Sequence, residues 1–412
     1  HLLHTSGVYL PGHGTPTVIM FGRNQRPVSP VVRAVRAKRG ETGVPADPAI
    51  APIWLEISEH VGEPGFEGHF VSVGNAPRSI FAKHPWAVGG GGASDLKDAL
   101  DETGSKTLGN VTRAVGFYLD THADEAFVQP SDFPRRFGLG LAYRTMVRGE
   151  GLRDWTKTSD ESIFFPFDQD LVLWPEVPLE PSWAWIHALR TSLWGRSVFG
   201  HRTYRAAGKQ WFDFHQFPRD RGRAARLLAF GEIATHFNTG LYDGSSVFNR
   251  TAPVIVLPID ATEDQHLELL GLLNSSTACF WLKQICFPKG GDTVGKEGAR
   301  IRKLLWDVYY AFDSTKLKQF PIPEEKPLAL TKQIQAEADQ RSALLPEQLC
   351  AKGGVTRTSL DQARSQAMSS LTRMIALQEE LDWQCYQIYG ILEEDLTHPS
   401  DHLPPLQLGE RA

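Results

Sequence analysis

The sequence predicts a mixed fold in which α/β and α+β parts are followed by a helical C-terminal segment. In residues 1–40 and again in 108–330, short apolar runs alternate with turn residues, which is typical of strands. After the proline-rich turn at residues 320–323, the composition shifts to Ala, Gln, Glu and Leu, and apolar residues recur at helical spacing. The chain has 412 residues, which is enough for two or three hydrophobic cores rather than one.

The N-terminal part is expected to begin with strands. Residues 18–21 (Val-Ile-Met-Phe) form a short apolar run, and residues 31–36 mix apolar and basic residues as a half-exposed strand does. Residues 22–30 are rich in turn formers, so they predict a β-hairpin between the two runs. Residues 53–61 predict a short helix that ends at a glycine and a proline. A sheet left unfinished here would expose a strand edge.

The middle of the chain is expected to contain strands interrupted by two helices. Residues 163–165 and 254–257 are apolar runs of strand length. The two predicted helices cover residues 221–237 and 264–285.

The C-terminal part predicts helix followed by an irregular tail. Apolar residues from Leu371 to Ile388 follow helical spacing, and Gly390 is a candidate C-cap. Residues 397–412 are polar and proline-rich, which favours disorder.

The composition excludes several classes of protein. Hydrophobic residues make up 41% and aromatic residues 10% of the chain, as in a globular protein with real cores. No stretch approaches the roughly 20 continuous apolar residues of a membrane span. The 4 cysteines show no CxxC spacing, which argues against a zinc site and for a reducing, cytoplasmic location. The net charge of −5 counts against a module that simply coats DNA, but it allows basic residues gathered on one face.

Patterns that suggest catalytic or metal chemistry are incomplete. The run Gly89–Gly92 lacks the GK[ST] ending of a phosphate loop, so a flexible joint or a helix start capped by Ser94 is the better interpretation. His1, His4 and His13 lack a carboxylate or cysteine at a recognisable ligand spacing. Asp213, His215 and His236 have no accompanying nucleophile motif. The sequence therefore predicts no catalytic and no metal-binding residue in this chain.

Two basic and aromatic clusters predict contact with nucleic acid. The first lies in residues 201–212, and the second lies in residues 289–303 with glycines between the charges. Guanidinium and ammonium groups reach phosphates or guanine edges, and glycines let a backbone approach a ligand closely. The alternative for each cluster is an ordinary solvated surface. The residues predicted to bind DNA are Arg202, Arg205, Lys209, Trp211, Lys289, Lys296, Arg300, Arg302 and Lys303.

Several segments, in order along the chain, resemble one family. Residues 4–23 (HTSGVYLPGHGTPTVIMFGR) resemble the segment after the catalytic motif in PglX-type adenine-specific DNA methyltransferases of BREX and Pgl phage-resistance systems. Residues 116–128 (GFYLDTHADEAFV) are similar to the opening of that family's target-recognition domain, with His122 in place of a glycine. Further matches are residues 81–86, the Arg-Gly segment at 147–155, LLGLLNS at 269–275, FPIP at 320–323 and ALQEELDWQCY at 376–386.

The resemblance implies transfer of a methyl group from S-adenosylmethionine to N6 of an adenine flipped out of the DNA stack. The NPPY-type motif that would hold the base is absent, as are the cofactor loop and its acidic residue. The chain is therefore expected to be the C-terminal portion of such an enzyme and to be inactive alone. The complete enzyme would use S-adenosylmethionine, and this chain alone would bind none. The implied partners are double-stranded DNA, a missing methyltransferase domain or separate catalytic chain, and other phage-defence proteins; no membrane partner is expected.

The resemblance also implies a division into four parts. Residues 1–105 would finish a Rossmann-like methyltransferase sheet and bridge to the next domain, and residues 106–325 would form the target-recognition domain. Residues 326–396 would form a helical scaffold, and residues 397–412 a disordered tail. Two other classes of protein stay open at this point: a nuclease with an unrecognised site, and a non-enzymatic scaffold subunit of a defence complex.

Overall fold

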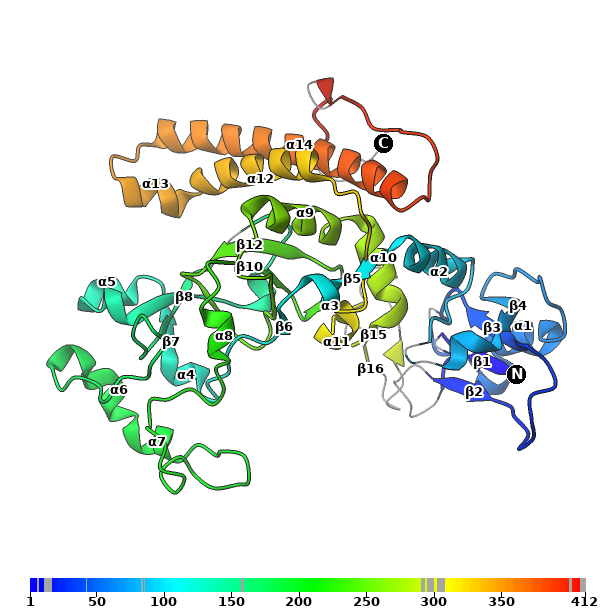
Figure 1. Cartoon of the computed structure of the whole chain (residues 1–412), viewed down its shortest axis with the longest axis horizontal. Helices are drawn as coiled ribbons and strands as arrows, with labels where there is room; N and C mark the ends of the chain where they lie inside the picture. The colour runs from blue at the N-terminus through cyan, green and yellow to red at the C-terminus, as the bar shows by residue number, and fades with distance from the viewer. Residues whose placement is uncertain are drawn as a thin grey trace.

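The computed structural model describes residues 1–5, 7–10, 17–41, 43–82, 84, 86–156, 159–289, 293–294, 300–301, 308–399 and 402–407. The fold is a mixed α/β arrangement with several small sheets and a long C-terminal helix, α14 (Figure 1). An N-terminal sheet lies at one end, a central body lies beneath α14, and a lobe that contains α6 and α7 lies at the other end (Figure 1). In the part of the chain described here, no helix is both long and apolar enough to cross a membrane.

The N-terminal sheet has the strand order β2-β1-β3-β4. Its strands are β1 (Leu2–His4), β2 (Val18–Met20), β3 (Val31–Ala37) and β4 (Val71–Pro77). Helix α1 (Pro52–His60) lies where a helix is predicted, and its Ile53 and Ile57 are buried with Leu3 and Val73 of the sheet. The predicted hairpin is wrong, because β1 lies between β2 and β3 and pairs antiparallel with the first and parallel with the second. The connection of residues 21–30 is longer than a hairpin turn, so the buried β1 takes the interior place and β2, exposed at all three positions, takes the edge.

A central antiparallel sheet separates two hydrophobic cores. Its order is β12-β10-β14-β6, with β6 (Ala114–Gly116), β10 (Arg226–Phe230), β12 (Thr239–Asp243) and β14 (Val254–Val256). In β10, Leu228 and Phe230 belong to one core, whereas Leu227 and Ala229 belong to the other. The predicted helix over residues 221–237 is therefore wrong: only the single turn α8 (Arg219–Gly222) is helical there. A strand buried on both faces reads as a continuous apolar run, which periodicity does not distinguish from a helix.

A second sheet, β13-β8-β9-β7, carries the aromatic core. Its strands are β7 (Val128–Pro130), β8 (Tyr143–Val147), β9 (Glu161–Phe164) and β13 (Val247–Phe248). The strands predicted at residues 163–165 and 254–257 are confirmed by β9 and β14, each to within one residue at its C-terminal end.

The predicted helix over residues 264–285 divides into α9 (Glu263–Leu273) and α10 (Ser276–Ile285). Ser275 is the N-cap of α10, and its side chain accepts a hydrogen bond from the backbone N–H of Ala278 at 3.2 Å. The Asn274 side chain accepts from the backbone N–H of Thr239 at 2.9 Å and donates to the carbonyl of Thr239 at 3.0 Å. The Asn-Ser pair thus ends one helix, starts the next and ties both to β12.

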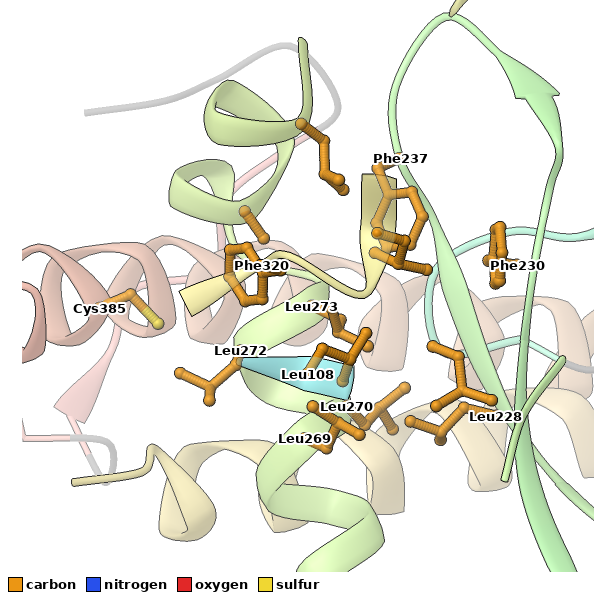
Figure 2. Packing of buried hydrophobic residues seen from close by; sticks show 14 of the residues in the cluster. Leu108, Leu228, Phe230, Phe237, Leu269, Leu270, Leu272, Leu273, Phe320 and Cys385 are labelled. Carbon is orange, nitrogen blue, oxygen red and sulfur yellow. The ribbon is translucent and has the colours of Figure 1, made fainter. Parts of the chain in front are cut away.

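The C-terminal helices pack on the central body. They are α12 (Leu328–Ala343), α13 (Pro346–Lys352) and α14 (Arg357–Ile388). Gly390 follows α14 and has φ +66°, the left-handed conformation in which glycine commonly ends a helix. The glycine predicted to end this helix is therefore confirmed. Figure 2 shows Leu108, Phe320 and Cys385, which are far apart in the sequence, around the leucines of α9. The C-terminal helices therefore share a core with the middle of the chain.

Three segments that carry the family resemblance meet beside that core. The Trp155 indole N–H donates to Gln378 Oε1 at 2.9 Å, and the Gln378 side-chain amide donates to the carbonyl of Asn274 at 3.1 Å. Directly after Asn274 and Ser275, the backbone N–H of Ser276 donates to Asp382 Oδ1 at 2.7 Å. The hydroxyls of Ser276 and Tyr386 hydrogen-bond at 2.8 Å. The polar residues of these segments therefore serve to join α14 to the body.

Helix α2 (Ala93–Thr103) connects the N-terminal sheet to the body. The glycine run precedes it, and Gly92, with φ +79°, is the N-cap; Ser94 lies inside the helix and is not the cap. The Trp281 indole N–H donates to Asp101 Oδ1 at 2.7 Å, and the Thr103 hydroxyl donates to the carbonyl of Tyr389 at 3.1 Å.

The remaining described elements are short. They are η1 (Pro48–Ile50), η2 (Arg78–Ala82), β5 (Lys106–Thr107), α3 (Leu108–Val111), α4 (Asp124–Phe127), α5 (Phe133–Phe137), η3 (Gly140–Ala142), η4 (Gly149–Gly151), η5 (Pro181–Trp183), α6 (Ala184–Ala188), α7 (Arg190–Trp194), β11 (Ile233–Ala234), β15 (Phe287–Pro288), β16 (Thr293–Val294), β17 (Arg300–Ile301), β18 (Tyr310–Ala311), α11 (Ser314–Leu317) and β19 (Pro321–Ile322).

Candidate nucleic-acid interface

Residues 181–212 form a basic lobe. They contain Arg190, Arg196, Arg202, Arg205 and Lys209 and no Asp or Glu. The lobe comprises η5, α6, α7 and the following loop, and it lies on the side of the molecule away from α14 (Figure 1). Five positive charges are therefore concentrated in 32 residues of a chain whose net charge is −5.

Arg196 is the internal brace of this basic lobe. Its guanidinium donates hydrogen bonds to four backbone carbonyls: those of Thr121, Leu193 (3.1 Å), Trp211 (2.7 Å) and Asp213 (2.8 Å). The same group lies 4.1 Å from the ring centroid of Tyr204, which is fully buried. Burial lowers the pKa of the Arg196 guanidinium. The positive charge of Arg196 therefore interacts with backbone carbonyls and an aromatic ring inside the protein.

The other basic residues lie at the surface and use aromatic rings as supports. Arg190 and Arg205 are exposed, and their guanidinium carbons lie 4.3 and 5.4 Å from the ring centroid of Trp194. Lys209 is half-buried; its Nζ lies 3.9 Å from the Asp213 carboxylate. Burial raises the pKa of the Asp213 carboxyl, and Lys209 acts in the opposite direction. The two arginines are therefore held in place with their charge directed to solvent.

Arg202 lies in a tight hairpin that projects from the lobe. The backbone N–H of Val198 donates to the carbonyl of Arg202 at 2.8 Å. Gly200 and His201 have φ of +88° and +63°, in the left-handed region, and Phe199 is 74% exposed. The tip of this hairpin thus displays an aromatic ring next to an exposed arginine.

The first predicted cluster is brought together only in part. Arg202 and Arg205 of the basic lobe are exposed and Lys209 is half-buried, and their contact with DNA stays a prediction. Trp211, by contrast, is 4% exposed and packs against Phe212 with ring centroids 5.3 Å apart. Trp211 therefore supports the fold and is not available for stacking on a base. Sequence reasoning missed Arg190, which the absence of acidic residues around it could have indicated.

The structure describes two of the predicted residues in the second cluster, Lys289 and Arg300. Lys289 is exposed after β15, and its backbone N–H donates to the carbonyl of Tyr309 at 2.6 Å. Arg300 belongs to β17, whose backbone pairs with β16. Lys296, Arg302 and Lys303 lie outside the described residues. A cavity of about 390 Å³ lies beside β15, and basic residues from both the N-terminal sheet and the body line it: Lys38, Arg39 and Lys283.

The glycine run has a packing role. The backbone N–H of Gly90 donates to the carbonyl of Ala37 at 3.1 Å, and that of Gly91 donates to the Ser72 hydroxyl at 3.3 Å. A Cβ at Gly90 would lie 2.8 Å from the carbonyl oxygen of Arg36. These N–H groups are therefore engaged within the protein and do not point at a phosphate.

Of the histidines considered in the sequence, those that the structure describes make contacts within the protein, whereas His13 lies outside the described residues. His4 Nδ1 accepts from the backbone N–H of Ala37 at 3.4 Å, and burial lowers the pKa of His4 to about 4. His215 stacks on His122 with ring centroids 3.6 Å apart, and His236 contacts Thr235. Among the described residues, no group of three or more His, Cys, Asp or Glu side chains is arranged to hold a metal ion.

His122 lies in a turn at a position where the family pattern has a glycine. Its φ is +53°, so the turn keeps the left-handed conformation that glycine adopts most easily. The backbone N–H of His122 donates to Asp120 Oδ1 at 3.0 Å, and Ala123 N–H donates to the Thr121 hydroxyl at 3.0 Å. His122 therefore adopts a backbone conformation that a glycine at this position could also adopt.

Comparison with known proteins supports the resemblance. Over 421 aligned residues, which include the whole chain, the sequence is 39% identical to the adenine-specific methyltransferase PglX of Streptomyces coelicolor. The chain is similar to PglX throughout. It spans 34% of the length of PglX, and no family model matches it. The match to PglX confirms the family resemblance that the sequence motifs indicate.

Two solved structures are also similar, at lower levels. The type IIL restriction-modification enzyme MmeI in complex with DNA has a TM-score of 0.38 and 13% identity, with 70% of this chain and 36% of that chain covered. The type IIG restriction endonuclease BpuSI has a TM-score of 0.37 and 9% identity, with 88% and 41% covered.

Proposed function

We propose that the chain recognises DNA as part of a site-specific DNA-adenine N6-methyltransferase of a phage-defence system. The observation that carries the proposal is the basic lobe, with its surface cations, in a chain 39% identical to an adenine-specific methyltransferase, PglX. Exposed arginines bind phosphates and guanine edges, and phosphate contacts set the orientation in which base contacts specify a sequence. The surface residues proposed for this role are Arg190, Arg202, Arg205, Lys209 and Lys289.

The four-part division predicted from the sequence belongs to the same proposal. Residues 1–105 would complete a Rossmann-like sheet, residues 106–325 would recognise DNA, and residues 326–396 would support them. The separate hydrophobic cluster of the N-terminal sheet supports the distinction of the first part, and the core shared beneath α14 supports the bracing role of the C-terminal helices. A cytoplasmic location and a disordered tail at residues 397–412 stay predictions.

We assign the methyl-transfer chemistry to parts of the enzyme other than this chain. S-Adenosylmethionine would supply the methyl group in the complete enzyme. The glycine run does not fit this cofactor, because the N–H groups of Gly90 and Gly91 are already engaged by Ala37 and Ser72. The sequence also lacks an NPPY-type motif. We therefore derive no catalytic step from the residues of this chain.

Electrophoretic retention of duplex DNA tests the proposal. The purified chain is titrated into labelled DNA of random sequence at several salt concentrations, with unlabelled competitor. We expect binding that weakens steeply with salt, because cations released from phosphates drive the association. The double variant R202A/R205A should reduce the slope of log K against log salt by about 2, since each lost phosphate contact lowers it by about 1.

Matched controls make the outcome specific. The variant R135A/R136A removes two other arginines, which lie on α5 outside the basic lobe. It should leave the salt slope unchanged. Equal effects of the two double variants, or no binding by the parent chain at any salt, would contradict the proposal and favour a scaffold role. Metal-dependent cleavage of the DNA by the chain alone would favour a nuclease.

A further inference from the structure

The hairpin tip of the basic lobe holds a large apolar ring in solvent. Phe199 is 74% exposed, and the two residues after it, Gly200 and His201, both have positive φ. A left-handed conformation at His201 is unfavourable for a residue with a side chain, so surrounding contacts must maintain it. Neither the exposure of Phe199 nor this turn is explained by burial in the core.

The ring of Phe199 is supported from behind by two histidines. It contacts His215 with centroids 5.0 Å apart and an interplanar angle of 51°. His215 in turn stacks on His122 at 3.6 Å and 11°. His215 is 9% exposed, and His122 belongs to the turn formed by residues 120–123. The three rings form a row that orients Phe199 before any ligand binds, which lowers the entropy lost on binding.

The hairpin and the residues on either side of it in the sequence carry positive charge, as a binding site for a polyanion requires, and a carboxylate behind the rings, that of Asp120, lies 3.4 Å from His122 Nε2. Arg202 lies in the same hairpin and Arg205 follows it, and both side chains are exposed. No acidic residue lies between residues 181 and 212. An aromatic ring flanked by cations can stack on bases while the cations bind the neighbouring phosphates. Apolar side chains of DNA-binding proteins also enter partly between base steps and unstack them.

We propose that Phe199 inserts between stacked base pairs of duplex DNA while Arg202 and Arg205 bind the flanking phosphates. The inference rests on the proposed DNA-recognition function and adds to it a residue that deforms the DNA. Insertion replaces base–base stacking with base–Phe stacking and breaks no covalent bond. Its cost is the lost base stacking, which is smallest where the duplex is already weakened by a mismatch.

The test compares two duplexes of the same sequence, one fully paired and one with a single mismatched pair, at one salt concentration. The parent chain should bind the mismatched duplex more tightly, by about 3- to 30-fold, because part of the unstacking is already done. F199A should lose this preference and bind both duplexes about 5- to 50-fold more weakly than the parent binds the mismatched one. F199W, which keeps a stacking ring, should keep the preference.

Leu179 provides a control for loss of an exposed apolar side chain, since it is 86% exposed and lies outside the hairpin. L179A should bind as the parent does, and F199A should bind with the same salt slope as the parent, because no charge has changed. A preference for the mismatch that persists in F199A, or parent binding without any preference, overturns the insertion and leaves DNA recognition intact. No binding by the parent chain overturns both, so the two failures are distinguishable.

Discussion

Arg196 offers a test of how the basic lobe is held, because its charge is internal. The informative pair of variants is R196M and R196K. R196M keeps most of the apolar stem and removes every donor to the carbonyls of Thr121, Leu193, Trp211 and Asp213. R196K keeps the positive charge, but a single ammonium lacks the planar fork that reaches carbonyls in different directions.

The magnitude follows from the four lost hydrogen bonds. A hydrogen bond to a charged group contributes about 1.5–3 kcal/mol, and a carbonyl that water can reach recovers part of this. Arg196 is half-buried, so water will replace some of the lost donors. We therefore expect R196M to lower the free energy of unfolding by about 2–4 kcal/mol, and R196K by about 1–3 kcal/mol.

Urea unfolding followed by tryptophan fluorescence measures both values, since the chain has 11 tryptophans. DNA retention at a temperature where both variants are folded provides the second measurement. R196K should bind DNA more weakly than the parent despite its unchanged net charge, because the lobe is displaced. Unfolding free energies within about 0.5 kcal/mol of the parent would refute the bracing role. A loss of DNA affinity in R196M but not in R196K would show instead that Arg196 acts through its charge.

Three further predictions concern the rest of the chain. N274A should lower the free energy of unfolding by about 1–3 kcal/mol, because it removes two buried hydrogen bonds to the backbone of Thr239, whose carbonyl keeps only the bond from Trp155 N–H at 3.3 Å; urea unfolding beside the exposed-site control N24A checks this, and a loss equal to that of the control would contradict it. The pKa of His4 is about 4 in the folded chain and about 6.5 in the unfolded chain. As the pH falls below 6.5, the unfolded chain binds a proton at His4 before the folded chain does, so the free energy of unfolding should decrease by up to about 3 kcal/mol between pH 6.5 and 4. H4N keeps an acceptor for Ala37 N–H without titrating, and parallel pH curves for parent and H4N would refute this explanation. A chain that starts at Ala93 should melt at a higher temperature than one that starts at Lys106, because Leu100 and Asp101 of α2 contact the body; equal midpoints in thermal melts would mean that these contacts contribute nothing.

The sequence correctly predicted elements that depend only on residues close together in the chain. The apolar positions of α1 and the glycine after α14 need only neighbours along the chain, and both predictions are confirmed. Strand β10 could not be predicted in this way, because its alternate residues are buried in two different cores and residues 227–230 form a continuous apolar run. Its assignment depends on partners from β12 and β14.

In the candidate site, too, the features that depend on residues distant in the sequence could not be predicted. Exposed Arg202 and Arg205 lie where the charge pattern indicated, since long cationic side chains usually stay at the surface. Trp211 belongs to the same cluster in the sequence, yet its burial is decided by rings such as His187, 24 residues earlier, with centroids 5.4 Å apart. The bracing role of Arg196 is likewise hidden, because its carbonyl partners reach back to Thr121.

The concentration of charge in the basic lobe has a consequence for how quickly and in what orientation the protein meets DNA. Of the 43 Lys and Arg residues, 5 lie in residues 181–212, which leaves 38 basic and 48 acidic residues, a net charge of −10, in the remainder. In the field of a polyanion such a molecule experiences a torque that turns its positive end forward, while the rest is repelled. Productive encounters should then be enriched at low ionic strength, and the acidic remainder should shorten the lifetime of wrongly oriented collisions.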